Sequence, residues 1–192
     1  MDPRVEKRIG IKSLFDKVVS PQEAAALIED GSVVGMSGFT RAGDAKVVPT
    51  ALVERAKAEP FKIDVYTGAS LGPEVDKYLA EAGAIRKRSP FQADSGIRNL
   101  INSGGVTYVD AHLSHNAELV RQGIIGPIKH AIIEAVAITE DGEIIPTTSV
   151  GNSPIFAQYA ENIIVELNLT HPESMIGIHD IYVPGEQGKR DP

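Results

Sequence analysis

The sequence predicts an α/β protein with an open, mostly parallel sheet and helices on both faces of the sheet. Apolar, β-branched segments alternate with helical segments along almost the whole chain. That order is typical of strand–helix–strand crossovers. The segment 130–139 is apolar with an incomplete alternation, as expected of a strand that is covered on both faces. Glycine-rich connections follow the predicted strands, at the positions where such sheets bind ligands.

The individual elements follow from capping and turn signals. A capping box of Ser20, Pro21 and Glu23 predicts a helix that ends near Gly31. Strands are predicted at 33–34, 62–67, 106–109, 130–139 and 162–167, and the turn at 140–143 returns the chain through 144–146. Further helices are predicted after Lys46 with Pro49 in the first turn, from Pro73 to about Gly83, from Asp94 through Ile101 and from Ser114 to about Gln122.

Composition narrows the class of protein. A chain of 192 residues corresponds to one domain with a sizeable core. A formal net charge of −7 argues against a nucleic-acid partner, and zero cysteines exclude disulfides and Cys-ligated zinc. No apolar run reaches the length of a membrane span, and the first residues lack a signal-peptide pattern. We therefore expect a cytoplasmic protein with no membrane partner.

Three strand-to-helix junctions are candidates for a ligand site, at 35–43, 68–72 and 150–153. Each consists mainly of small or hydroxyl-bearing residues, so a ligand can approach the backbone closely. The helix that follows the first junction offers free N–H groups to an anion. Neither the Walker motif nor the dinucleotide fingerprint occurs at this junction.

The stretch 68–72 also matches the G-x-S-x-G pattern of a hydrolase nucleophile elbow, with Ser70 as the nucleophile. Histidines follow later in the chain, so their order is compatible with a Ser hydrolase. However, only about two strands precede Ser70, and no H-G-G-G segment occurs upstream. The pattern therefore favours a loop hydroxyl that lines a ligand site.

Two charged or metal-binding patterns have alternative interpretations. His112 and His115, with Asp110 before them, have the spacing of a metal pair but no evident third ligand, which favours an exposed loop with Ser114 as helix cap. The basic run Arg86–Arg88 either lies on the surface or meets a phosphate, and Arg88 lies near a predicted strand end.

Glu134 lies inside the apolar strand, where a buried carboxylate needs a partner. It is therefore either a site residue or a structural partner, for example of a helix N-terminus.

Several ordered motifs together resemble one family. They are V-V-G-M-S-G-F-T-R-A-G-D-A-K-V-V-P-T-A-L, Y-T-G-A-S-L-G-P-E-V-D, K-R-S-P-F-Q-A-D, R-N-L-I-N-S-G, E-A-V-A-I-T-E-D-G-E-I-I-P-T-T-S-V-G-N-S and G-I-H-D-I. From about Val18 to Ile181 the chain resembles the N-terminal half of the acetyl-CoA hydrolase/transferase family. These are single-chain class I CoA-transferases of the succinyl-CoA:acetate type.

The resemblance implies an enzyme of two similar α/β halves that transfers CoA between carboxylic acids or hydrolyses an acyl-CoA. It also implies a glutamate nucleophile on the C-terminal half, which no position here matches, so the chain alone is expected to be inactive. The implied substrates are an acyl-CoA, that is a coenzyme A thioester, and a small carboxylate, with no permanently bound cofactor. We expect residues 1–168 to form the domain and 169–192 a linker toward the C-terminal CoA-transferase domain, in a homo-oligomer.

The resemblance also assigns supporting residues, with no catalytic residue and no metal ligand in this chain. The assigned substrate- or CoA-binding residues are Ser37, Gly38, Phe39, Ser70, Gly151 and Asn152. Two alternatives remain open. One is a non-catalytic subunit that completes a CoA-transferase site with a partner chain, and the other is a hydrolase that depends on Ser70.

Overall fold

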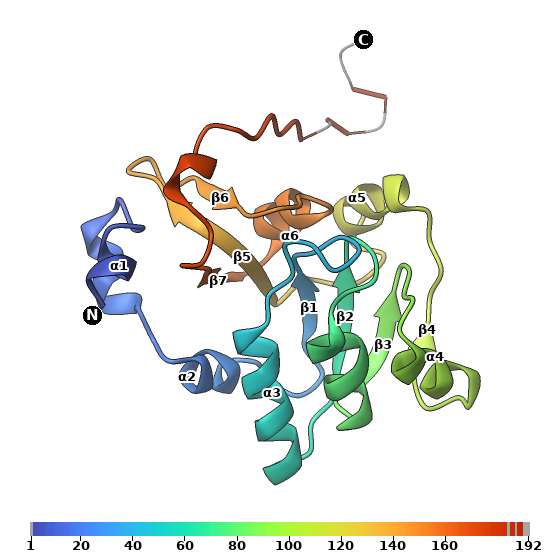
Figure 1. Ribbon diagram of the computed structural model, residues 1–192. Helices are drawn as coiled ribbons and strands as arrows, with labels where there is room; N and C mark the ends of the chain where they lie inside the picture. Colours follow the sequence, from blue (N-terminus) through green and yellow to red (C-terminus); the bar gives the residue numbers. More distant parts are fainter. Residues whose placement is uncertain (1, 184, 187, 190–192) are drawn as a thin grey trace.

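One mostly parallel sheet organises the molecule (Figure 1). The computed structural model describes residues 2–183, 185–186 and 188–189. Its strands are β1 (Val33–Met36), β2 (Ile63–Thr67), β3 (Ile85–Ser89), β4 (Thr107–Tyr108), β5 (His130–Ile138), β6 (Ile144–Pro146) and β7 (Asn162–Leu167). The strand order is β4-β3-β2-β1-β5-β6, and β7 pairs with β5. Only the β5–β6 pair of these strands is antiparallel, so the predicted fold class is confirmed.

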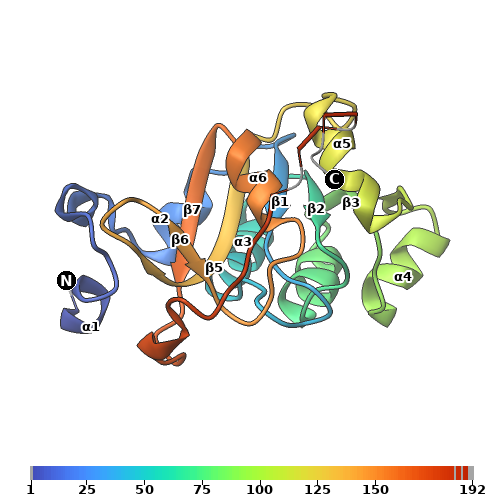
Figure 2. The same cartoon turned by 90° about the horizontal axis from the view of Figure 1, so that it is seen from above.

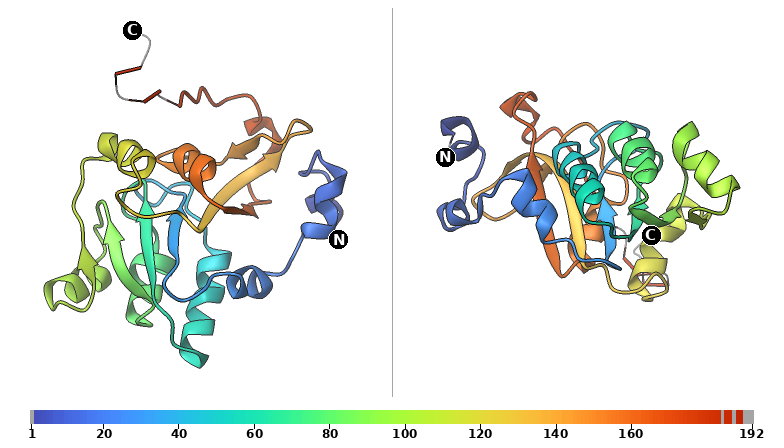
Figure 3. Two further views of the ribbon diagram at one scale, coloured as in Figure 1. Left: turned by 180° about the vertical axis from the view of Figure 1, so that it is seen from behind. Right: turned by 90° about the horizontal axis from the view of Figure 1, so that it is seen from below.

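Helices cover both faces of the sheet. They are α1 (Pro3–Glu6), η1 (Lys12–Lys17), α2 (Pro21–Ala26), α3 (Val47–Ala58), η2 (Glu74–Leu79), α4 (Ser95–Asn102), α5 (Leu113–Arg121), α6 (Ser153–Tyr159) and η3 (Glu173–Met175). In the right panel of Figure 3, α2, α3, η2 and α4 lie in a row along one face. Figure 2 shows α5 and α6 on the side opposite to η2.

Side-chain alternation along the strands separates two hydrophobic cores. Val34 and Ile132 face the core under α2, α3 and η2. Their neighbours Ala131 and Ile133 face the second core under α5 and α6. Successive residues of a strand point to opposite faces, so each central strand supplies both cores. This explains why the sequence of β5 is apolar at nearly every position.

Strand β5 pairs with three other strands because different strands pair with its two halves. Residues 130–132 pair with β1, and residues 130–134 pair with β7. The second half pairs with β6, and Ile138 bridges to Ile9 from the N-terminal segment. Every residue from His130 to Ala137 is buried.

Most local predictions from capping are confirmed. Ser20 and Glu23 form the reciprocal capping box of α2, and Asp94 accepts a hydrogen bond from the Gly96 N–H at 2.7 Å. The predicted Ser114 cap is wrong. His112 stands at the N-cap of α5 without a side-chain cap bond, and the Ser114 hydroxyl instead pairs with His112 Nδ1 at 2.9 Å.

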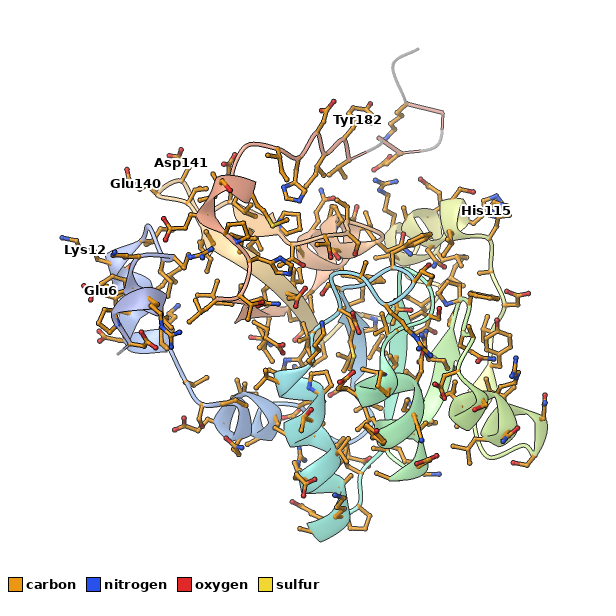
Figure 4. The ribbon with its side chains drawn as sticks, viewed as in Figure 1. Glu6, Lys12, His115, Glu140, Asp141 and Tyr182 are labelled. Carbon is orange, nitrogen blue, oxygen red and sulfur yellow. The ribbon has the colours of Figure 1, made fainter. Side chains whose placement is uncertain are left out.

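The segment after β7 runs back along the domain. The Arg8 guanidinium donates to the His171 carbonyl at 2.7 Å, and His179 Nε2 is 2.8 Å from the Thr147 carbonyl. Tyr182, which Figure 4 labels on this segment, is 72% exposed. The predicted linker 169–192 lies partly outside the described residues, and the boundary at 168 stays a prediction. None of the described helices is long and apolar enough to cross a membrane.

His130 predicts a pH dependence of stability. Its side chain is 3% exposed, and neither ring nitrogen has a hydrogen-bond partner among the described residues. Burial lowers the pKa of His130, and Lys129 lowers it further, whereas Glu29 and Glu161 act in the opposite direction. As the pH falls below about 6.5, the unfolded chain binds a proton that the folded chain resists, so stability is lost.

We expect the unfolding free energy to fall more steeply from pH 7 to pH 5 in the wild type than in His130→Leu. The measurement is urea unfolding at several pH values. His115→Gln, which changes an exposed histidine, is the control and should keep the wild-type slope. Equal slopes in wild type and His130→Leu would contradict the assignment.

Candidate functional site

The three predicted junction loops meet at the carboxyl edge of the sheet. The closest approach is between backbones: a Cβ atom added to Gly68 would lie 2.5 Å from the Gly38 carbonyl oxygen. A Cβ atom on Gly151 would lie 3.3 Å from the Gly68 Cα atom and 3.4 Å from the same Gly38 oxygen. Gly38 also has φ +127°, which side chains other than hydrogen rarely permit. The glycines are therefore required for contact between the loops.

Hydrogen bonds lock these loops together. The Asn152 side chain donates to the Thr67 carbonyl at 3.1 Å, and the Arg41 N–H donates to the Ser70 carbonyl at 3.3 Å. Asp44, from the loop after β1, accepts from the Gly72 N–H at 2.9 Å. Each loop is thus held by a residue from another loop.

Of the predicted residues Ser37, Gly38 and Phe39, only Phe39 has substantial exposed surface. Ser37 is 2% exposed, and its hydroxyl donates to the Gly43 carbonyl and accepts from the Glu134 N–H. Ser37 therefore anchors the loop to β5. Phe39 is 41% exposed, and the following residues Thr40 and Arg41 have positive φ values of 52° and 65°. Such strain in residues other than glycine is common at functional sites.

Glu134 is a structural partner of Lys46. The Glu134 carboxylate is buried and accepts hydrogen bonds from the Thr147 hydroxyl, from Asn168 Nδ2 at 2.8 Å and from Lys46 Nζ at 3.3 Å. Burial lowers the pKa of Lys46, but Asp44 and Glu134 raise it more, so its pKa lies above the usual value. Lys46 is therefore a cation that pairs with both carboxylates beneath the loop.

The N-terminus of α3, predicted as an anion site, is filled from within the protein. The Glu166 carboxylate on β7 accepts hydrogen bonds from three consecutive backbone N–H groups of Lys46, Val47 and Val48 at 2.7–3.0 Å. A carboxylate here also meets the positive end of the helix dipole. External phosphates are thus excluded from this helix end.

Arg88 does not meet the phosphate that the sequence suggested. It is 0% exposed, and all five of its N–H donors are directed to protein acceptors, including a two-point pair with the buried Asp76. Arg86 and Lys87 pair with Asp64 at 2.7 and 3.3 Å. The segment 85–89, which the sequence suggested only as a connection, is the full strand β3. Its alternation was obscured because Arg88 lies inward.

Ser70 lies in the β2 connection with 3% of its surface exposed. Its hydroxyl makes no hydrogen bond within the part of the chain that the structure describes. In that part no hydrogen bond joins it to a histidine, and His112 and His179 bond instead to Ser114 and to the Thr147 carbonyl. The hydrolase interpretation requires a paired base, which is therefore missing here.

The His112–His115 pair has rings 5.5 Å apart, but no group of three metal-binding side chains occurs among the described residues. Figure 4 shows His115 at the outer surface of α5.

A cavity of about 530 Å³ lies at the same edge of the sheet. It is lined by Phe39 and Thr40 after β1, Ala69 after β2, Phe91 after β3 and residues 110–113 after β4. The sequence analysis did not assign Phe91 or 110–113 to the site, because the connections after β3 and β4 lack the glycine pattern. The signal that identifies them is their place directly after strand ends.

Comparisons with known proteins show the family of the chain. The model of the acetyl-CoA hydrolase/transferase N-terminal domain matches residues 3–189. The chain belongs to this family. It is 44% identical to a succinyl-CoA:acetate CoA-transferase of Clostridium kluyveri over 97% of this chain and 35% of that protein. It is 36% identical to an acetyl-CoA hydrolase of Candida glabrata, over 98% of this chain and 38% of that protein.

The fold of this family domain also matches a solved structure. RipA from Yersinia pestis aligns with a TM-score of 0.66 at 22% identity, over 90% of this chain and 40% of that chain. The predicted family is thus confirmed. The chain spans only a little over a third of the curated relatives' length, 35% and 38% in the two cases above.

The capping of α3 by Glu166 yields a prediction about stability. Glu166→Gln removes the charge and leaves one acceptor oxygen for three N–H groups. We expect the unfolding free energy to fall by about 1–2 kcal/mol. The measurement is urea unfolding at neutral pH. Glu161→Gln, which disrupts an exposed pair with Lys129, is the control and should change little. Equal effects of the two substitutions would contradict the capping role.

Proposed function

We propose that this chain is the first α/β half of an enzyme that transfers CoA between carboxylic acids or hydrolyses an acyl-CoA. The observation that carries the proposal is the meeting of three family loops beside a 530 Å³ cavity at the carboxyl edge of the sheet. Two curated relatives are named as a CoA-transferase and an acetyl-CoA hydrolase, and both are much longer than this chain. A second half that follows the linker would account for the additional length.

The chemistry that the family resemblance implies is covalent catalysis by a glutamate of that second half. Its carboxylate attacks the thioester carbonyl and expels the CoA thiolate, which leaves an acyl–glutamyl anhydride. The thiolate then attacks the glutamyl carbonyl, so the first acid leaves and a glutamyl–CoA thioester remains. In hydrolysis, water takes the place of the second acid. This chain supplies binding groups and no nucleophile.

The proposed roles of the site residues follow from their contacts. Gly38 and Gly151 permit the close approach of the loops, and Ser70 offers a hydroxyl to the ligand. Phe39 lines the cavity with exposed apolar surface. Ser37 and Asn152 support the loops without contacting the ligand, since their side chains donate hydrogen bonds to backbone carbonyls.

The remaining parts of the proposal concern the setting of the enzyme. The CoA thioester is a substrate, with no resident cofactor, and a small carboxylate is the second substrate. The absence of cysteine fits the reducing cytoplasm. We also propose a homo-oligomer. A non-catalytic subunit that completes its site with a separate chain is the alternative.

The proposal predicts that the 192-residue chain alone has no catalytic activity and that the protein with both halves is active. The measurement is CoA exchange between succinyl-CoA and acetate, with acetyl-CoA hydrolysis followed in parallel. Turnover by the chain alone above a buffer control would place a nucleophile within it and contradict the proposal. Activity that appears only after addition of a separate subunit would support the alternative.

Ser70→Ala separates a supporting residue from a nucleophile. One neutral hydrogen bond contributes about 0.5–1.5 kcal/mol, so kcat/KM of the two-half enzyme should fall about tenfold. A nucleophile would be worth a factor of about 10⁴ or more. Steady-state kinetics beside the wild type decide between them. A loss above about a thousandfold with an unchanged unfolding midpoint would revive the hydrolase interpretation.

A further inference from the structure

Two side chains hold residues 67–71, the β2 loop, from the interior of the protein. This segment begins at Thr67, the last residue of β2. We infer that Arg88 and Asp76 are positioning residues that fix this β2 loop in the shape that presents Ser70 and its neighbouring N–H groups to the acyl-CoA. The inference rests on the proposed function. Neither residue reaches solvent, since both are 0% exposed. They act on the ligand only through the loop.

The Arg88–Asp76 pair is a complete fork. Arg88 Nε donates to Asp76 Oδ1 at 2.8 Å, and a terminal nitrogen donates to Oδ2 at 3.2 Å. The three remaining N–H groups of Arg88 donate to Thr67 Oγ1 at 2.8 Å, to the Ser89 carbonyl at 2.7 Å and to the Ala69 carbonyl at 2.9 Å. A guanidinium fixes its five donors in one plane, which a lysine ammonium cannot reproduce.

The side chains of this pair form hydrogen bonds to both ends of the β2 loop. Arg88 binds the Thr67 side chain and the Ala69 carbonyl, and Asp76 Oδ2 accepts from the Leu71 N–H at 2.7 Å. The Ser70 carbonyl accepts from the Arg41 N–H. These bonds therefore hold the backbone on both sides of Ser70.

Three donors of the β2 loop stay unused within the protein. The Ser70 hydroxyl and the backbone N–H groups of Ala69 and Ser70 make no hydrogen bond to any described residue. Ala69 and Ser70 are each only 3% exposed, so donors without acceptors are unfavourable there. Ala69 also lines the cavity. An oxygen acceptor of the substrate, a thioester carbonyl or a carboxylate, is the chemistry that fits these donors.

The presence of a buried ion pair at this position supports a role of Arg88 and Asp76 in fixing the geometry of the loop. Replacing such a pair by apolar residues of similar size is often neutral or favourable for stability. Hydrophobic packing is non-directional, whereas the Arg88 fork sets the positions of a hydroxyl and two carbonyls. Stability alone therefore does not account for an ion pair at this position.

The test uses the two-half enzyme with Arg88→Lys and the double variant Arg88→Met/Asp76→Leu. The double variant avoids the unpaired buried carboxylate that Arg88→Met alone would leave. Arg86→Lys is the matched control, because Arg86 lies on the same strand and pairs with Asp64 at 2.7 Å without touching the β2 loop. Two quantities are measured: kcat and KM per folded enzyme, and amide hydrogen exchange of the segment 67–72.

We expect both Arg88 variants to lose about 10- to 100-fold in kcat/KM, the effect of one or two misplaced hydrogen bonds. We also expect faster exchange of the segment that contains the Leu71 N–H, while Arg86→Lys keeps wild-type values of both. Unchanged exchange, or a folded double variant within about twofold of wild-type kcat/KM, would overturn the inference. If wild-type enzyme shows neither CoA exchange nor acetyl-CoA hydrolysis, the proposed function fails, and hydrogen exchange alone still decides whether the pair positions the loop.

Discussion

The buried guanidinium of Arg88 is the interaction on which the carboxyl edge of the sheet depends. It joins β3 to η2 through Asp76 and to the connection after β2 through Thr67 and Ala69. The five directed donors of this one cation specify the geometry of the loop. Packing alone cannot do so, because apolar contacts have no preferred direction. The shape of the loop beside the cavity is therefore a consequence of a charge that no ligand touches.

The other carboxylates near this edge also have partners within the domain. Glu134 and Asp44 share Lys46, and Glu166 occupies the N-terminus of α3. At the three loops a ligand meets close backbone, hydroxyl and aromatic surface, together with the Arg41 side chain, which is 57% exposed and pairs with Asp94 at 3.4 Å.

Prediction from sequence was most successful where local chemistry decides the structure. The capping box at Ser20, the Asp94 cap and the apolar strand 130–139 were all correct, since each depends on neighbouring residues or on a simple burial pattern. The Ser114 cap was wrong because the helix begins one residue before it, at Leu113, which leaves Ser114 inside the helix and His112 at the N-cap. Strand β3 was missed because a buried arginine resembles a surface residue in sequence.

The sequence by itself determined the α/β class, the family and the three loops that approach one another, because periodicity, capping and ordered motifs are local properties of the chain. Only the tertiary structure decided what the charged residues do. Arg88 met Asp76 rather than a phosphate, Glu134 met Lys46, and Glu166 reached the helix end that the sequence left open. Each of these partners comes from a distant or separate element, and a pairing across the fold leaves no periodic trace in the sequence.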